Sequence, residues 1–96
     1  MPGREEIRLD DVLAALADPI RRRVVAELAS VGECTCGTFA LPVSDSTRSH
    51  HMRVLREAGL TSTRAVGTQR LVSLRRDDLD ARFPGLLDAV LTAPPA

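Results

Sequence analysis

Residues 44–60, SDSTRSHHMRVLREAGL, concentrate side chains that could do chemistry. They hold two adjacent histidines, three arginines and four hydroxyl groups. A metal site, a catalytic base and a DNA-reading surface could each use some of them. A second group lies in GECTCG, where the thiolates of Cys34 and Cys36 could hold a soft metal ion. The elements that position these residues decide between the alternatives.

The two histidines are poorly spaced for joint metal binding. On a helix, neighbouring side chains point about 100° apart, so His50 and His51 cannot chelate one ion from a single helix face. We expect His51 to pack at the edge of the core with one ring nitrogen bonded to the backbone. No acid or nucleophile accompanies the histidines at motif spacing, and the chain is therefore predicted not to be an enzyme.

Length and composition indicate one small globular domain over residues 1–96, with 44% apolar and 27% charged residues. No apolar run approaches the roughly 18 residues that cross a bilayer. The start, MPGREEIRLDD, lacks the basic and apolar parts of a signal peptide. We therefore expect a cytoplasmic protein without membrane contact, whose cysteines stay reduced.

Charge is uneven along a chain whose net charge is zero. Residues 1–43 carry five arginines against seven acids, giving −2, and residues 77–96 carry one against four, giving −3. Residues 44–76 carry seven arginines against two acids, giving +5. A basic centre between acidic ends is typical of a local polyanion contact, although a solvated arginine-rich surface would look the same.

Apolar spacing predicts helices before and within the segment of interest. One covers residues 9–17, and a second begins at Asp18-Pro19, a capping residue followed by proline, and stops at Gly32. Residues 35–41 allow a short helix. A longer one begins at Ser44, buries Met52, Leu55 and Ala58, and ends where Gly59 takes the left-handed conformation.

Beyond residue 60 the pattern changes to that of a hairpin. LTSTRAV and QRLVSL are rich in β-formers and flank Gly67-Thr68. Residues 77–91 return to helical spacing, with Pro84-Gly85 as a kink or break. The prediction is a mainly α winged helix-turn-helix of about five helices and a two-stranded hairpin, divided into N-terminal helices (9–31), helix-turn-helix (33–59), wing (60–75) and last helix (77–91).

The segments LADPIRRRVVAELA, CTC and STRSHHMRVLREAGL, followed by a hairpin, resemble the arsenic-repressor (ArsR/SmtB-type) family of bacterial transcription factors. The resemblance runs from about Leu9 to Leu91, and SHHMRVLREAGL is its most specific part. It implies a homodimeric repressor that joins through its first and last helices and leaves a double-stranded DNA operator when an inducer binds. The C-terminal apolar stripe, larger than a small core needs, also favours a partner surface.

The resemblance places DNA-binding residues on the recognition helix and the wing. Hydroxyls there can donate to phosphates or bases, and arginines can neutralise phosphates. The candidates are Ser44, Ser46, Thr47, Arg48, Ser49, His50 and Arg53 on the helix, and Arg64, Thr68, Gln69 and Arg70 on the wing.

Two positions depart from the family pattern. Position 48 is normally aliphatic; because a buried unpaired guanidinium is costly, we expect Arg48 to extend its head to solvent or phosphate, or else to lie idle at the helix edge. The cysteine segment is one residue shorter than in arsenic-responsive members. Cys34 and Cys36 could bind arsenite or another soft ion, but would need local unwinding and cannot complete a three-sulfur site within one chain. The alternative is two structural cysteines and no cofactor.

Three functions therefore compete. The leading hypothesis is a sequence-specific DNA-binding repressor. A winged helix used only for protein–protein contact is the alternative, and the +5 central segment argues against it. A small thiol enzyme is disfavoured because Cys34 has no histidine or aspartate at motif spacing.

Overall fold

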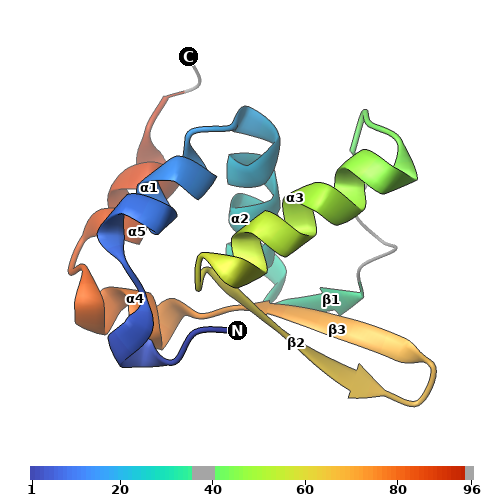
Figure 1. Ribbon diagram of the computed structural model, residues 1–96. Coiled ribbons are helices and arrows are strands. Elements are labelled where there is room, and N and C mark those ends of the chain that lie inside the picture. Colours follow the sequence, from blue (N-terminus) through green and yellow to red (C-terminus); the bar gives the residue numbers. More distant parts are fainter. Residues whose placement is uncertain (36–40, 95–96) are drawn as a thin grey trace.

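The computed structural model describes residues 1–35 and 41–94 (Figure 1). Helices and strands follow one another in the order of a winged helix-turn-helix. They are η1 (Arg4–Glu6), α1 (Leu9–Leu16), α2 (Pro19–Val31), β1 (Glu33–Thr35), α3 (Asp45–Glu57), β2 (Thr61–Val66), β3 (Gln69–Leu74), α4 (Arg76–Arg82) and α5 (Leu86–Thr92). No helix among these residues is both long and apolar enough to cross a membrane.

The two N-terminal helices form where local signals predict them. Asp18 Oδ1 accepts hydrogen bonds from the backbone N–H groups of Ile20 (2.8 Å) and Arg21 (3.2 Å) and so caps α2. Capping satisfies donors that have no partner within the helix. Gly32, with φ of 87°, ends α2. Both predicted helices are present, and α1 ends at Leu16, one residue before the expected end.

Helix α3 is fixed at both ends by the residues expected to fix it. Ser44 Oγ accepts a hydrogen bond from the Thr47 N–H at 3.3 Å. Gly59, at φ 90°, follows the helix, and a Cβ there would lie 2.7 Å from Cγ1 of Ile7. Glycine therefore serves twice at this position: it takes a left-handed conformation, and it lets the N-terminal segment pack closely.

The sheet has three strands rather than the predicted two. Strands β2 and β3 form the expected hairpin, with Val66 opposite Gln69, and β1 adds to the other side of β3, with Glu33 opposite Ser73 and Thr35 opposite Leu71. The expected short helix over 35–41 is wrong at Thr35, which belongs to β1, and residues 36–40 lie outside the described part of the chain. A three-residue strand is too short to show a period, and its partner lies far along the sequence.

The last predicted helix is two helices. Chain direction changes between α4 and α5, where Gly85 has φ of 84° and proline precedes it. The predicted break at Pro84-Gly85 is thus confirmed. Leu79 of α4 and Leu87 of α5 are both buried, so each half contributes separately to the core.

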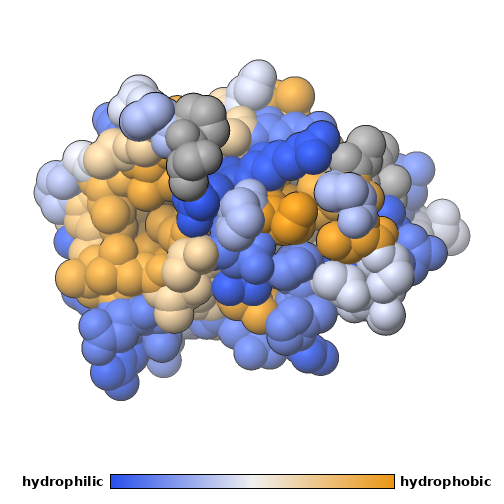
Figure 2. All heavy atoms as spheres, turned by 90° about the horizontal axis from the view of Figure 1, so that it is seen from above, coloured by the Kyte–Doolittle hydropathy of each residue, from blue (hydrophilic) through white to orange (hydrophobic). Residues whose placement is uncertain are grey.

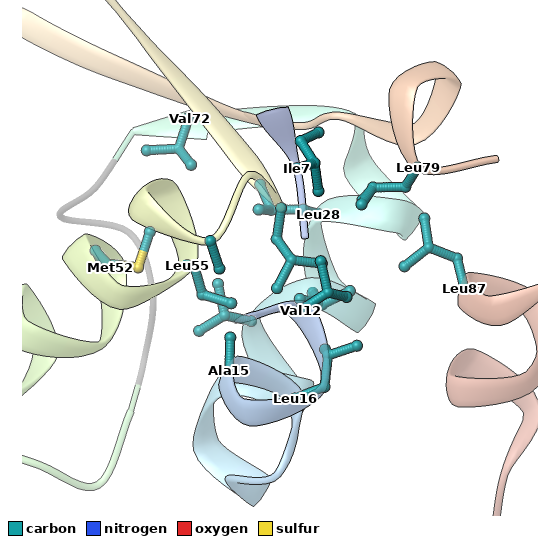
Figure 3. Close-up of a cluster of buried hydrophobic side chains, with 14 residues drawn as sticks. Ile7, Val12, Ala15, Leu16, Leu28, Met52, Leu55, Val72, Leu79 and Leu87 are labelled. Carbon is teal, nitrogen blue, oxygen red and sulfur yellow. The ribbon is translucent and has the colours of Figure 1, made fainter. Parts of the chain in front are cut away.

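One continuous core joins helices α1 to α5 and strand β3 (Figure 3). In Figure 3, Leu55 from α3 lies close to Leu28 from α2 and Val12 from α1, and all three are fully buried. Leu79 and Leu87 close the core from the C-terminal helices. Since interiors pack at crystal-like density, the core holds α3 firmly against the rest of the protein.

Candidate nucleic-acid interface

Helix α3 has one buried face and one polar face. His51, Met52 and Leu55 are buried. The other face is exposed and carries hydroxyl, imidazole and guanidinium groups, at Ser46, Thr47, Ser49, His50 and Arg53. This division follows the helical period of the sequence. The exposed face presents hydrogen-bonding groups on a rigid support.

Hydroxyl groups cluster at the start of α3. Ser44 Oγ lies 3.2 Å from Ser46 Oγ and donates to Thr47 Oγ1 at 3.0 Å. All three residues are exposed. The Thr47 hydroxyl keeps its proton for a ligand and the Ser46 hydroxyl keeps acceptor sites, because a hydroxyl has one donor and two acceptor sites.

The two histidines have separate environments. Exposed His50 lies with Nδ1 3.4 Å from Arg53 Nη2, whereas His51 is 8% exposed. Their ring centroids are 5.9 Å apart and the ring planes are tilted by 53°. Among the residues described, no group of three or more histidine, cysteine or acidic side chains could hold a metal ion.

His51 is bonded to a side chain and not, as expected, to the backbone. Its Nδ1 lies 3.2 Å from Arg21 Nη1, and Arg21 Nε also donates to the Ala15 carbonyl at 2.6 Å. A guanidinium can only donate, so Nδ1 of His51 is the acceptor in this hydrogen bond. Sequence reasoning missed Arg21, because the contact joins residues on different helices.

Arg48 lies at the edge of the helix, as expected, but its head group has a protein partner. The side chain is 28% exposed, and Nη2 lies 3.2 Å from Asp45 Oδ1 one turn earlier. The guanidinium is thus neither buried unpaired nor simply in solvent. Asp45 is 93% exposed, so the pair is accessible to a phosphate.

The four wing residues predicted to contact DNA, Arg64, Thr68, Gln69 and Arg70, are all exposed. Arg70 has no hydrogen bond or ion pair within the described chain, and its head group is available. Arg64 instead donates from Nε and Nη2 to the two carboxylate oxygens of Glu33, at 3.1 and 2.9 Å. The hydrogen bond from Arg64 lowers the pKa of Glu33 below its usual value. Sequence reasoning missed Glu33, because no local pattern links β1 to β2.

One of the two cysteines, Cys34, lies in the described part of the chain. Cys34 lies in β1, is half-buried and stands opposite Val72 of β3. Cys36 falls in residues 36–40, outside the described ranges. Of the predicted thiol site, the structure therefore locates Cys34 alone, at the edge of the wing sheet.

Known proteins are similar to this chain in both sequence and architecture. A helix-turn-helix domain family matches residues 16–64, from the end of α1 into β2. The chain is 35% identical to the HTH-type transcriptional regulator YceK of Bacillus subtilis, over 82% of each chain. It is also 38% identical to the transcriptional repressor SmtB homologue of Synechocystis, over 70% of this chain and 52% of that protein. The chain belongs to the ArsR/SmtB family.

A solved structure of an ArsR family transcriptional regulator supports the same assignment for this ArsR/SmtB-type regulator. It superimposes with a TM-score of 0.70 over 83% of this chain and 89% of the other, at 26% sequence identity. The family consists of DNA-binding transcriptional regulators and not of enzymes. In this fold α3 takes the position of the recognition helix, and β2 and β3 form the hairpin of the wing.

Proposed function

We propose that this ArsR/SmtB-type regulator represses transcription as a homodimer that places α3 in the major groove of an operator. The observation that carries the proposal is the two-sided character of α3: its inner face is buried in the core, and its outer face bears only polar groups at its start. A rigidly held polar helix of this kind can read base edges.

The residues divide into reading and positioning groups. Ser46, Thr47, Ser49 and His50 face outward near the start of α3, where a recognition helix meets base edges. Phosphate contacts come from Ser44, Arg48 and Arg53 on the helix and from the wing residues Arg64, Thr68, Gln69 and Arg70. Phosphate contacts fix the position of the protein, and base contacts give specificity.

Apolar surface on α1 and α5 supports the homodimer. Leu9 and Leu13 of α1 are 44% and 47% exposed, and Val90 and Leu91 of α5 are half-buried. Figure 2 shows apolar side chains gathered on the side of the molecule that α1 and α5 form, while the rest of this view is mostly polar. A groove of about 890 Å³ beside them, between α2 and α5, is lined mainly by apolar residues. A contiguous apolar surface on a small protein is typical of a protein–protein interface, and a second copy is the partner we propose.

Sensing through Cys34 and Cys36 is the second part of the proposal. The thiolates would take arsenite or another soft ion. Cys34 belongs to β1, which pairs with β3 of the wing. Ligand binding there would thus shift the wing directly, a different route from the short supporting helix expected from the sequence.

Binding to a fluorescent DNA duplex, selected from a random pool by the native protein, tests the main proposal. Half-sites should lie about 10 bp apart, or near a multiple of that, and affinity should fall steeply with salt. Salt-independent binding would contradict it, as would a protein that stays monomeric at micromolar concentration.

A further inference from the structure

Glu33 and Arg64 form a pair that spans the sheet of the wing. Glu33 lies on β1 and Arg64 on β2, with β3 between them. The register places Glu33 opposite Ser73 and Arg64 opposite Leu71. Ser73 and Leu71 are two residues apart on β3 and share one face, so both charged side chains project from that face and meet across it.

The Glu33–Arg64 pair has good hydrogen-bond geometry, but it is accessible to other ions. Both carboxylate oxygens accept from the guanidinium, at 2.9 and 3.1 Å, which is the bidentate arrangement that arginine also offers to a phosphate. The side chains of Arg64 and Glu33 are 64% and 35% exposed. A DNA phosphate can therefore compete with Glu33 for the same two N–H groups.

Arg70 provides the contrast within the same wing. It lies opposite Ala65 on β2, so its side chain projects from the sheet face opposite to that of Arg64. That face is also the one on which Val72 packs into the core. Arg70 has no carboxylate partner among the residues described and meets DNA with its full charge, whereas the charge of Arg64 is compensated.

We infer that Glu33 limits operator affinity by holding Arg64, an inference that rests on the proposed placement of the wing beside DNA. For Arg64 to contact a phosphate, it must give up both hydrogen bonds to Glu33. A bare carboxylate would then remain near the DNA backbone. The gain from the new contact is reduced by these two losses, so Arg64 contributes less to affinity while Glu33 is present than it would without Glu33.

Glu33→Gln, Arg64→Gln and the double variant test the inference on the selected operator duplex. Glu33→Gln should bind more tightly and release about one more counterion. Its advantage over the native protein should then be about 3.5-fold greater at roughly 50 mM than at roughly 200 mM salt. Arg64→Gln should weaken the native protein less than it weakens the Glu33→Gln variant, so the double variant should lack the gain of Glu33→Gln.

Glu27→Gln is the matched control, because Glu27 is an exposed acid on α2, outside the sheet, and its loss changes net charge equally. An equal gain from Glu27→Gln would overturn the inference, since net charge alone would then explain it. Weaker binding by Glu33→Gln at unchanged melting temperature would also overturn it, because Glu33 would then present Arg64 to DNA. If the native protein fails to bind any duplex in a salt-dependent way, the proposed function fails first.

Discussion

The guanidinium of Arg21 joins the start of α2 to the middle of the recognition helix through Nδ1 of His51, at 3.2 Å. The same side chain donates to the Ala15 carbonyl at the end of α1. Three helices thus meet at one residue. Arg21 is a positioning residue for α3.

Replacing Arg21 should therefore lower both stability and DNA affinity. Arg21→Ala leaves the buried His51 nitrogen and a helix-end carbonyl without a donor, which should cost about 1–3 kcal/mol of the free energy of unfolding. Urea denaturation measures this loss. Arg23→Ala is the control, since Arg23 is exposed on the same helix and no hydrogen bond or ion pair is described for it; it should stay within about 0.5 kcal/mol of the native protein. Equal losses from both changes would show that the junction is unimportant.

Residues of the recognition helix and of the wing should differ in what their loss does. Ser46→Ala or Ser49→Ala should change the ranking of operator sequences, because a lost base contact costs about 1–3 kcal/mol at one position. Arg70→Gln and Arg53→Ala should weaken binding to all sequences alike and reduce the salt slope by about one. Competition binding over a panel of operator variants distinguishes the two patterns. Similar effects from all four changes would mean that α3 does not enter the groove.

One substitution that introduces a charge can test the proposed dimer surface. Leu13→Glu puts a carboxylate in the apolar surface of α1 and should give a monomer in sedimentation experiments. Operator affinity should then fall about 100-fold or more, since each monomer can engage only one half-site. Val66→Glu, on the wing, changes a residue of similar exposure (45% against 47%) and should remain a dimer. If Leu13→Glu remains a dimer, the dimer interface does not include this surface of α1.

Acid should weaken the attachment of the N-terminal turn to α4. The hydrogen bond from Arg4, at 2.6 Å, and a second from Arg75 hold the pKa of Asp78 below its usual value. A carboxyl group with a lowered folded-state pKa contributes stability above its unfolded pKa of about 4, and this stability is lost as pH falls through the folded value. Asp78→Asn should thus melt earlier than the native protein at about pH 7, and the difference should disappear in strong acid. A difference that is constant with pH would exclude this origin.

The prediction of a cysteine sensor is tested by four operator affinities, those of the native protein and of the double Cys→Ser variant, each with and without arsenite. If Cys34 and Cys36 form a sensor, arsenite should weaken operator binding of the native protein by about 5–150-fold, the range of ordinary ligand coupling. The Cys34→Ser, Cys36→Ser double variant should bind DNA normally and ignore arsenite. Agreement of all four values would identify the pair as structural.

Elements governed by local signals could be predicted from the sequence. Asp18-Pro19 begins α2, Ser44 begins α3, and Gly67-Thr68 lies at the hairpin turn, each within a few residues of the expected place. Capping and turn residues act over three or four positions, so a single sequence reveals them. The exposed face of α3 followed from the same short-range periodicity.

Features that depend on tertiary contacts could not be predicted. Strand β1 exists because β3 offers it a partner, and GECTCG alone shows no strand period. The partners of His51 and Arg64 come from other elements, and a sequence pattern does not specify which arginine or carboxylate will lie nearby. Arg64 was predicted as a DNA-binding residue and His51 as a residue at the edge of the core, but their neighbours Glu33 and Arg21 were not predicted.

The third strand also divides the wing into a stiff base and a freer tip. Residues 71–73 of β3 have a strand on each side and are half-buried or buried, whereas residues 64–70 around the turn are all exposed. Backbone with fewer neighbours opens locally at lower free energy. If the wing lies beside DNA as proposed, binding must order this exposed tip, at a cost of about 0.5–1.5 kcal/mol for each long side chain that becomes ordered. On that placement, the freedom of the exposed residues Thr68, Gln69 and Arg70 before binding would set part of the operator residence time, without any change in the contacts of the bound state.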